Sequence, residues 1–207
     1  MIERAANRMQ RLIADLLDAQ RMADGRLVLD YGPTSIRAAI DEVRELIEPQ
    51  AAVKSLAMDF DVPDEIVHAD RSRLIQVLAN LVGNAVKFTP GHGRVVVGAR
   101  RDGDDVVFEV HDTGPGITKD GLVHVCDRYW RATGTTPTGT GLGLYIAHRI
   151  VIAHGGRFWV ESEVGVGSVF RFSIPVAGNS ESRITKAGDV AYSCTFDPPM
   201  HGTISAK

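Results

Sequence analysis

Residues 70–88 read DRSRLIQVLANLVGNAVKF and predict the central helix of the fold. Apolar residues recur along it at helical spacing, which predicts one buried face made of Leu74, Val77, Leu78, Leu81, Val82 and Ala85. Asp70 stands where an N-cap residue is expected. The remaining side carries a polar stripe at intervals of four, four and three residues, namely Gln76, Asn80, Asn84 and Lys87.

Strands in pairs are expected around this helix. The segment RVVVGARRDGDDVVFEVHD (94–112) predicts two strands joined by an Asp-Gly turn, and RFWVES (157–162) and SVFRFSIP (168–175) predict two more. SLAMDFDVP (55–63) and EIVHAD (65–70) alternate apolar and polar residues and are interpreted as a hairpin. LVLDYGP (27–33) is interpreted as a short strand.

Three more helices are expected between these strands. One starts at about Thr34 as N-cap and ends at Glu48 before Pro49, a short one lies near 121–125, and one runs from about Thr140 to His154. Helices that separate antiparallel strand pairs favour an α+β fold, a two-layer α/β sandwich with a mixed, largely antiparallel sheet, over a parallel doubly wound sheet.

Composition narrows the class of protein. With 207 residues, 44% apolar and 24% charged, the chain has the values of a globular protein. Its net charge of −3 gives no electrostatic reason to expect a nucleic-acid partner. Cys126 and Cys194 have neither a zinc-site nor a disulfide pattern, so a reducing cytoplasmic setting is expected. No apolar run reaches the length of a membrane span, although the parent protein can still be membrane-anchored through upstream segments.

The two ends of the chain differ in character. Ile2, Met9, Leu12, Ile13, Leu16 and Leu17 recur at helical spacing and predict an amphipathic helix over residues 2–22. A partner helix would cover this stripe, and packing on its own domain is the alternative. Residues 178–207 are polar and are expected to form a flexible tail. The predicted organisation is therefore 1–25 as a helical segment, 26–177 as the main domain and 178–207 as the tail.

Three groups of residues carry candidate chemistry. The carboxamide oxygens of Asn80 and Asn84 suit Mg²⁺, and Lys87 suits phosphate, although a solvated helix face would look the same. Asp112 ends a predicted strand in HDTGPGI, where its carboxylate can accept a hydrogen bond from an exocyclic amino group such as that of adenine. Gly114 and Gly116 would let the backbone approach the base, although an ordinary loop is the alternative.

The third group is GTGLGL, at the start of a predicted helix. Backbone N–H groups at a helix N-terminus bind phosphate when side chains do not obstruct them, which suits Gly139, Thr140, Gly141, Leu142 and Gly143. A flexible glycine hinge is the alternative. The spacing is neither that of a Walker loop nor that of the dinucleotide fingerprint. The three groups together predict a site for ATP with Mg²⁺.

In this order, the three groups resemble the ATP-binding domain shared by sensor histidine kinases, DNA gyrase, heat-shock chaperone ATPases and mismatch-repair ATPases. NLVGNAVKFTP is similar to the asparagine box of histidine kinases, DTGPG and GTGLGL are similar to their two glycine boxes, and HGGRFWVESEVGVGSVFRFSIP to their closing strands. CDRYWR (126–131) resembles the aromatic segment before their lid, with Cys126 in place of the first phenylalanine. The resemblance implies the Bergerat ATP-binding fold and covers about residues 1–175.

The resemblance also implies residue roles. Asn84 would bind Mg²⁺ with help from Asn80, Lys87 and Arg131 would meet phosphate, and Asp112 would bind adenine. The first helix is similar to the second helix of the kinase dimerisation hairpin, which implies a homodimer through residues 2–22. The implied partners are ATP, a histidine-bearing hairpin helix and a response regulator of a bacterial two-component system.

Kinase and hydrolase differ at one position of this pattern. Related ATPases carry a glutamate base four residues before the magnesium asparagine, where this chain has Asn80. A carboxamide takes up no proton at neutral pH, so phosphoryl transfer to a positioned nucleophile is favoured over hydrolysis. None of the seven histidines lies on a predicted helix with the acidic residue and proline that follow the acceptor of the family. The acceptor is therefore expected in trans, and a non-catalytic nucleotide-binding module that pairs with a kinase remains an alternative.

Overall fold

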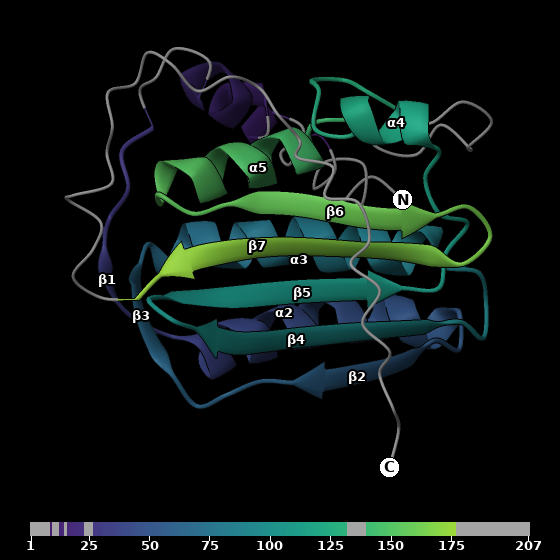
Figure 1. Ribbon diagram of the computed structural model, residues 1–207, viewed down its shortest axis with the longest axis horizontal. Coiled ribbons are helices and arrows are strands. Elements are labelled where there is room, and N and C mark those ends of the chain that lie inside the picture. The colour runs from purple at the N-terminus through teal and green to yellow at the C-terminus, as the bar shows by residue number, and fades with distance from the viewer. Residues whose placement is uncertain (1–8, 10–12, 15, 23–26, 132–139, 177–207) are drawn as a thin grey trace.

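The computed structural model describes residues 9, 13–14, 16–22, 27–131 and 140–176 (Figure 1). In chain order its elements are β1 (Gly32–Ser35), α2 (Ile36–Val53), β2 (Ala57–Asp61), β3 (Ile66–Ala69), α3 (Arg71–Phe88), β4 (Arg94–Asp102), β5 (Asp105–Asp112), α4 (Lys119–His124), α5 (Gly143–Ala153), β6 (Phe158–Glu163) and β7 (Gly167–Pro175). The predicted tail over 178–207 lies outside the described residues. No helix in the described part has both the length and the apolar character needed to cross a bilayer.

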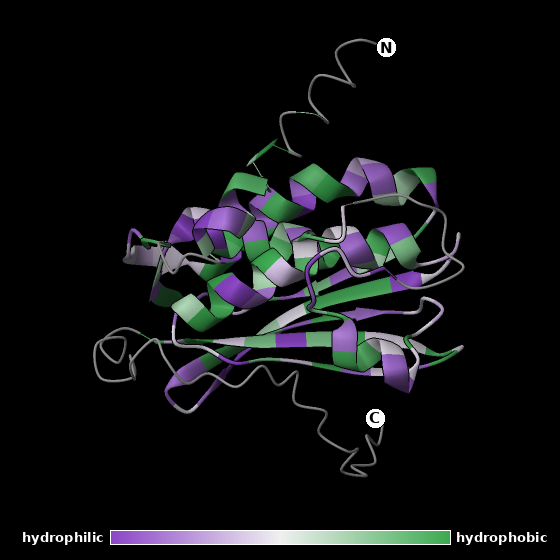
Figure 2. Ribbon diagram, turned by 90° about the horizontal axis from the view of Figure 1, so that it is seen from above, coloured by the Kyte–Doolittle hydropathy of each residue, from purple (hydrophilic) through white to green (hydrophobic). Residues whose placement is uncertain are grey.

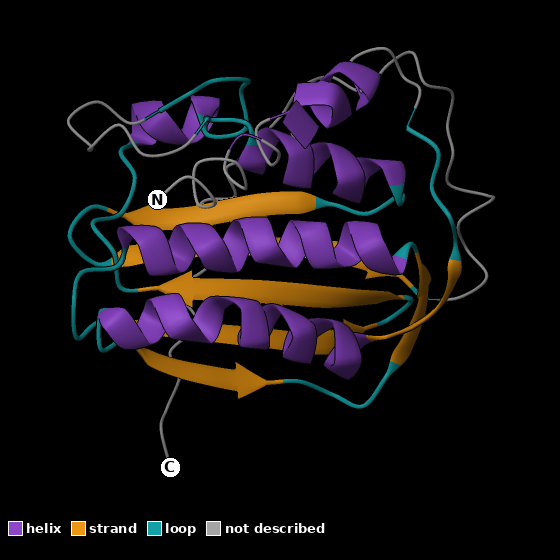
Figure 3. Cartoon of the chain, turned by 180° about the vertical axis from the view of Figure 1, so that it is seen from behind, coloured by secondary structure: helices purple, strands orange, loops and turns teal. Residues whose placement is uncertain are grey.

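Five strands form one mixed sheet in the order β2-β4-β5-β7-β6. β2 runs parallel to β4, and every other neighbouring pair is antiparallel. Helices α2, α3 and α5 lie on one face of this sheet (Figure 3), so that a helical layer covers a strand layer in the view from above (Figure 2). The predicted two-layer sandwich with a largely antiparallel sheet is confirmed.

The core lies between α3 and the sheet. All six residues predicted for the apolar face of α3 are buried, together with Val86. On the sheet, the rings of Phe108 and Phe172 are fully buried and stack with centroids 4.6 Å apart. Asp70 caps α3 as predicted, because its side chain accepts a hydrogen bond from the backbone N–H of Arg73. Burial of this apolar face leaves the polar side of α3 to face other elements.

The predicted hairpin of residues 55–70 is wrong. β2 pairs with β4 in the large sheet, whereas β3 pairs with β1 in a separate two-stranded sheet. The alternation of apolar and polar residues was correctly interpreted as two strands. It cannot choose a partner, because any strand with a matching buried face satisfies the same pattern.

Both predicted ends of α2 are also wrong. Its N-cap is Ser35, whose Oγ accepts from Ala38 N at 3.2 Å, while Thr34 Oγ1 donates to Ala69 O across the small sheet. The helix continues through Pro49 to Val53, with Ala51 buried. Proline costs a helix one hydrogen bond, and the burial of Ile47 and Ala51, two residues before and two after Pro49, offsets that loss. The helix predicted from Thr140 likewise begins three residues later, at Gly143.

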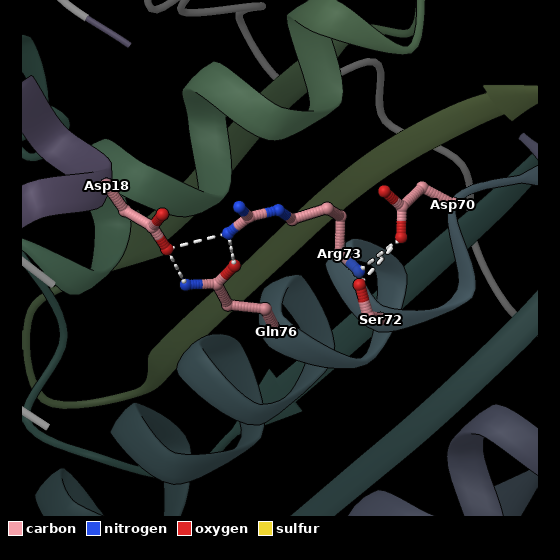
Figure 4. A network of polar contacts seen from close by, with 5 residues as sticks. All are labelled: Asp18, Asp70, Ser72, Arg73 and Gln76. Atoms are coloured by element: carbon pink, nitrogen blue, oxygen red, sulfur yellow. Dashed lines mark hydrogen bonds and ion pairs between the residues drawn. The ribbon is translucent and has the colours of Figure 1, made fainter. Parts of the chain in front are cut away.

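The described part of the N-terminal helix packs on α3. Ala19 and Met22 are buried in the core. Arg73 Nη1 donates to Asp18 Oδ2 at 2.6 Å, and Gln76 Nε2 donates to the same oxygen at 3.0 Å (Figure 4). Burial alone would raise the pKa of Asp18, but these hydrogen bonds and the charge of Arg73 lower it.

Another side of this helix has no cover among the described residues. Its exposed apolar side chains are Met9, Ile13, Leu16 and Leu17. Its own domain therefore covers one side of the helix, and a partner helix for the other side stays a prediction.

His154 joins the end of α5 to the start of α3. Its Nε2 accepts from Asp70 N at 3.1 Å, and its Nδ1 donates to Ile150 O at 2.9 Å. The ring of Tyr31 packs edge-on against it, with centroids 5.4 Å apart. Burial lowers the pKa of His154, although the Ile150 carbonyl and the charge of Asp70 partly oppose this. The neutral imidazole is thus the form that the fold requires.

This geometry predicts a pH-dependent stability. A histidine with a lowered native pKa binds its proton more readily in the unfolded chain, so stability falls as pH drops below about 6.5, the pKa of an unperturbed histidine. The slope is up to about 1.4 kcal/mol per pH unit for one such group. We expect His154→Gln to reduce this slope between pH 7 and 5.5 in urea unfolding.

His148, whose pKa burial also lowers, should supply the slope that remains in that variant. The exposed His92, with a φ of 63° that asparagine tolerates, provides the control variant His92→Asn. An unchanged slope in His154→Gln would contradict the assignment.

Candidate functional site

Asp112 is a buried carboxylate at the end of an interior strand. It is 5% exposed and lies between Val95 of β4 and Ser168 of β7. Its Oδ1 accepts from Gly114 N at 2.8 Å. Burial raises the pKa of Asp112, and the backbone N–H groups of Gly114 and Ser168 and the charge of His111 offset this only in part. An ionised carboxylate has further acceptor sites for a ligand donor.

The loop after Asp112 needs its two glycines for close approach. A Cβ on Gly114 would lie 2.6 Å from Asp112 Oδ1 and 3.5 Å from Phe88 O, at the end of α3. Gly116 has a φ of 70°, and a Cβ there would collide with Glu163 O at the end of β6. Gly114 therefore brings Asp112 against the C-terminal end of α3.

The polar stripe of α3 divides between two neighbours. Gln76 accepts from Arg73 and donates to Asp18, so it belongs to the contact with the N-terminal helix (Figure 4). Asn80 and Asn84 are half-buried, and Lys87 is exposed. The second half of α3 therefore carries the three stripe residues that were predicted for a ligand.

Asn80 faces the start of α5. Its Oδ1 would lie 3.1 Å from a Cβ on Gly143, and its buried Nδ2 has no hydrogen-bond partner within the described residues. A buried amide without a partner is costly, so this group suits a ligand acceptor such as a phosphate oxygen. Turned by 180°, the same carboxamide would present its oxygen to a cation.

The start of α5 lacks a side-chain cap. Leu142 is the N-cap residue and its side chain makes no capping hydrogen bond, so backbone N–H groups of the first turn can serve a ligand. Thr140 Oγ1 accepts from Leu142 N at 3.3 Å. Gly141 has a φ of 71° and lies against Tyr129, whose N–H donates to Gly141 O at 2.9 Å. Gly139, also predicted for this site, lies outside the described residues.

Cationic side chains gather beside these groups. Lys87 is exposed overall, but partial burial of its side chain, together with the positive charge of Arg131, lowers its pKa. The guanidinium of Arg128, which sequence analysis missed, lies 5.6 Å from the ring centroid of Tyr145 in α5. Its buried Nε has no hydrogen-bond partner in the part of the chain that the structure describes. Its only sequence signal is its position in the arginine- and aromatic-rich segment CDRYWR.

These groups lie at one end of the molecule. In Figure 1 the ends of β5 and β6 and helix α4 lie at the right-hand side, where the contacts above join them to α3 and α5. A buried carboxylate, two carboxamides, several cations and an uncapped helix can bind a ligand that has an amino group and an anionic end. Nowhere in the described ranges do three or more His, Cys, Asp or Glu side chains form a metal-binding group. A divalent cation here would therefore take carboxamide and ligand oxygens.

Comparison with known proteins gives matches of three kinds. Residues 69–178 match the family of histidine kinase-, DNA gyrase B- and HSP90-like ATPases. The chain is 36% identical over 172 residues to the adaptive-response sensory kinase SasA of Synechocystis sp.. This alignment covers 81% of this chain and 45% of that kinase. The chain thus spans less than half the length of this relative.

Solved structures agree with these matches. Full-length ShkA, in complex with AMPPNP, aligns with a TM-score of 0.73 at 34% identity, covering 84% of this chain and 37% of that one. The histidine kinase ThkA, in complex with the response regulator protein TrrA, aligns with a TM-score of 0.66 at 26% identity, covering 83% of this chain and 49% of that one.

The contact of Gly141 with Tyr129 gives a prediction about local stability. In Gly141→Ala the new Cβ would lie 2.7 Å from the Tyr129 carbonyl carbon, at a positive φ. We expect this to break the hydrogen bond between Tyr129 N–H and Gly141 O. Amide hydrogen exchange at Tyr129 should become about tenfold faster, which corresponds to a loss of about 1.4 kcal/mol in local stability.

The control is Gly103→Ala, because Gly103 has a similar φ of 61° with nothing near its Cβ position. That variant should leave exchange at Tyr129 unchanged. Equal exchange rates at Tyr129 in Gly141→Ala and the unmodified chain would contradict the described contact.

Proposed function

The chain belongs to the family of histidine kinase-, DNA gyrase B- and HSP90-like ATPases, and from this premise we propose that it is the ATP-binding catalytic core of a sensor histidine kinase. It would transfer the γ-phosphoryl group of ATP to a histidine. One observation carries this proposal: Gly114, two residues after Asp112, lies against Phe88 at the end of α3, and Gly143 at the start of α5 lies against Asn80 in the middle of the same helix.

In this proposal Asp112 binds the adenine. Its carboxylate accepts from the exocyclic amino group, and the buried setting makes that hydrogen bond stronger than it would be in water. Gly114 and Gly116 shape the loop that meets the base. Because the native pKa of Asp112 is raised, acid should weaken binding at a higher pH than for an ordinary aspartate.

The other groups meet the triphosphate. Lys87 and Arg131 supply positive charge, and Thr140, Gly141, Leu142 and Gly143 supply backbone N–H groups at the start of α5. Gly139 is proposed as part of this loop from the sequence alone. Asn84, with Asn80, would hold Mg²⁺, which supplies charge neutralisation on the phosphate oxygens when bound.

Transfer itself depends on position and charge. The lone pair of an imidazole nitrogen attacks the γ-phosphorus, an N–P bond forms, the bond to the β,γ-bridging oxygen breaks, and ADP leaves. Lys87 and Arg131 stabilise the charge on the transferred group, which in phosphoryl transfer provides most of the catalysis. Asn80 stands where related hydrolases carry a glutamate base, so activated water is the weaker acceptor.

The proposed partners follow from the same reading. The acceptor is a histidine on a hairpin helix, and phosphate then passes to a response regulator, as the solved complex of ThkA with TrrA suggests by similarity. The exposed stripe of Met9, Ile13, Leu16 and Leu17 would pair with another helix in a homodimer. We propose that this chemistry takes place in the cytoplasm, where ATP is available.

Replacing the residue that is proposed to bind adenine should weaken nucleotide binding. In Asp112→Asn one carboxylate oxygen becomes an amide donor, which faces the amino group of adenine with like polarity. We expect a loss of about tenfold to 100-fold in ATP affinity, the value of one charged hydrogen bond. Isothermal titration of the purified chain with ATP and Mg²⁺ measures it.

Asp102→Asn is the matched control, since Asp102 is exposed at the opposite end of the same strand pair. It should bind ATP as the unmodified chain does. An Asp112→Asn variant that is folded and keeps full affinity would refute the assignment of Asp112.

A transfer assay separates the proposed kinase from its alternatives. The chain is mixed with ATP labelled at the γ-phosphate, Mg²⁺ and a separate hairpin that bears an acceptor histidine. We expect the label to appear on the hairpin as an acid-labile phosphoramidate, with little free phosphate. An acceptor hairpin with His→Gln is the control and should stay unlabelled.

Two other outcomes would reject the kinase. Nucleotide binding without label on the hairpin would support a non-catalytic module that pairs with a kinase. Steady release of phosphate without an acceptor would support an ATP hydrolase.

A further inference from the structure

Lys54, the C-cap residue of α2, reaches across to the end of α3. Its Nζ donates to three backbone carbonyls, Val86 O at 2.9 Å, Lys87 O at 2.7 Å and Thr89 O at 2.7 Å. An ammonium group has three N–H donors. All three N–H donors of the Lys54 ammonium group therefore bind carbonyls at the C-terminal end of one helix.

The carbonyls that Lys54 binds are those that α3 cannot satisfy itself. The last four carbonyls of a helix lack a partner within it, and together they carry about half a negative charge. Ala85 O is satisfied by the backbone N–H and the Oγ1 of Thr89. Lys54 satisfies the next two carbonyls and the first one beyond the helix, and its full positive charge offsets the partial negative charge there.

The side chain of Lys87, the basic residue in the last turn of α3, lies beside an aromatic ring. The Nζ of Lys87 lies 4.4 Å from the ring centroid of Phe88, and the charge of Arg131 acts on it. Lys54 thus compensates the helix end from the side of α2. The two lysines act on the same turn in different places.

We propose that Lys54 is a positioning residue for the triphosphate part of the site, and this rests on the proposed binding of ATP. The turn that Lys54 holds presents Lys87 and follows directly on Asn84. A highly anionic ligand beside uncompensated carbonyls would be repelled, so the charge of Lys54 favours the phosphates although it touches none of them. Gly114, which meets Phe88 O, connects the same turn to Asp112.

The backbone of Lys54 strengthens this connection. Lys54 N donates to Ala51 O at the end of α2, and Lys54 O accepts from His92 N at 3.0 Å in the loop that follows α3. Main chain and side chain together join the end of α2 to both sides of the α3 terminus. The last turn of α3, which carries Lys87, is thus held by a residue 33 positions earlier in the chain.

A residue that only stabilised the fold would behave differently. Its replacement would lower the folded fraction and weaken the binding of all ligands alike. Replacing a residue that prepares the turn for phosphates should weaken the binding of ATP. It should leave the binding of adenosine, which has no phosphate, unchanged. The ratio of the two affinities is therefore the informative measurement.

The test uses the full chain with three substitutions at Lys54. Lys54→Met removes the charge and the donors, Lys54→Gln removes the charge and keeps two donors, and Lys54→Arg keeps the charge. ATP with Mg²⁺ and adenosine are titrated into each variant by ligand-observed NMR, at a temperature where thermal unfolding shows the variant to be folded. Arg101→Met, which removes an exposed charge at the far end of β4, is the control.

We expect Lys54→Met and Lys54→Gln to bind ATP about three- to tenfold more weakly, with adenosine affinity within about twofold, since a charge at a helix end is worth up to about one factor of ten. Lys54→Arg and Arg101→Met should bind ATP within about twofold of the unmodified chain. Should Lys54→Met fail to fold, the comparison of Lys54→Gln with Lys54→Arg carries the test.

The opposite results separate two failures. If the unmodified chain does not bind ATP, the proposed function falls and the role of Lys54 falls with it. If the unmodified chain binds ATP but Lys54→Gln binds it equally well, or loses ATP and adenosine in the same proportion, only the positioning role is overturned.

Discussion

The structure depends on one helix that packs on two sides. The apolar face of α3 is buried against the sheet, and that burial, at about 1.5–3 kcal/mol for each large side chain, holds the helix in place. The polar side of the same helix then has no freedom to turn away. Asn80, Asn84 and Lys87 are positioned by the leucines and valines behind them, so the stability of the core and the geometry of the site have one cause.

Both ends of α3 are held by groups from distant parts of the chain. At the start, Asp70 caps the helix, His154 accepts from its cap residue, and Asp18 accepts from Arg73. At the end, Lys54 binds the terminal carbonyls. The N-terminal helix therefore contacts the start of α3, and the candidate site forms around its end. A shift along the helix axis would disturb both.

The site separates charge along its length. Asp112 is a buried carboxylate whose pKa is raised, and the end of α3 and the start of α5 carry Lys87 and uncapped backbone N–H groups. A ligand with a neutral amino group at one end and phosphates at the other suits this order. The close contacts at Gly114 and Gly141 leave no room for a Cβ, so these glycines serve the packing between loops.

The sequence by itself determined the type of most elements, the buried face of α3 and the family resemblance that the comparisons confirmed. The elements and the buried face depend on local periodicity and caps, as in α3 with its Asp70 cap. The family resemblance depends on short motifs, the asparagine box and the two glycine boxes, and on their order along the sequence. Tertiary structure alone decided which strands pair and where α2 ends. Thus β2 pairs with β4 and not with β3, and α2 continues through Pro49. Tertiary structure also decided which polar residues meet, as Gln76 and Asp18 do. Lys54 and His154 carry no local signal for their roles, because each acts on a helix end that only folding brings within reach.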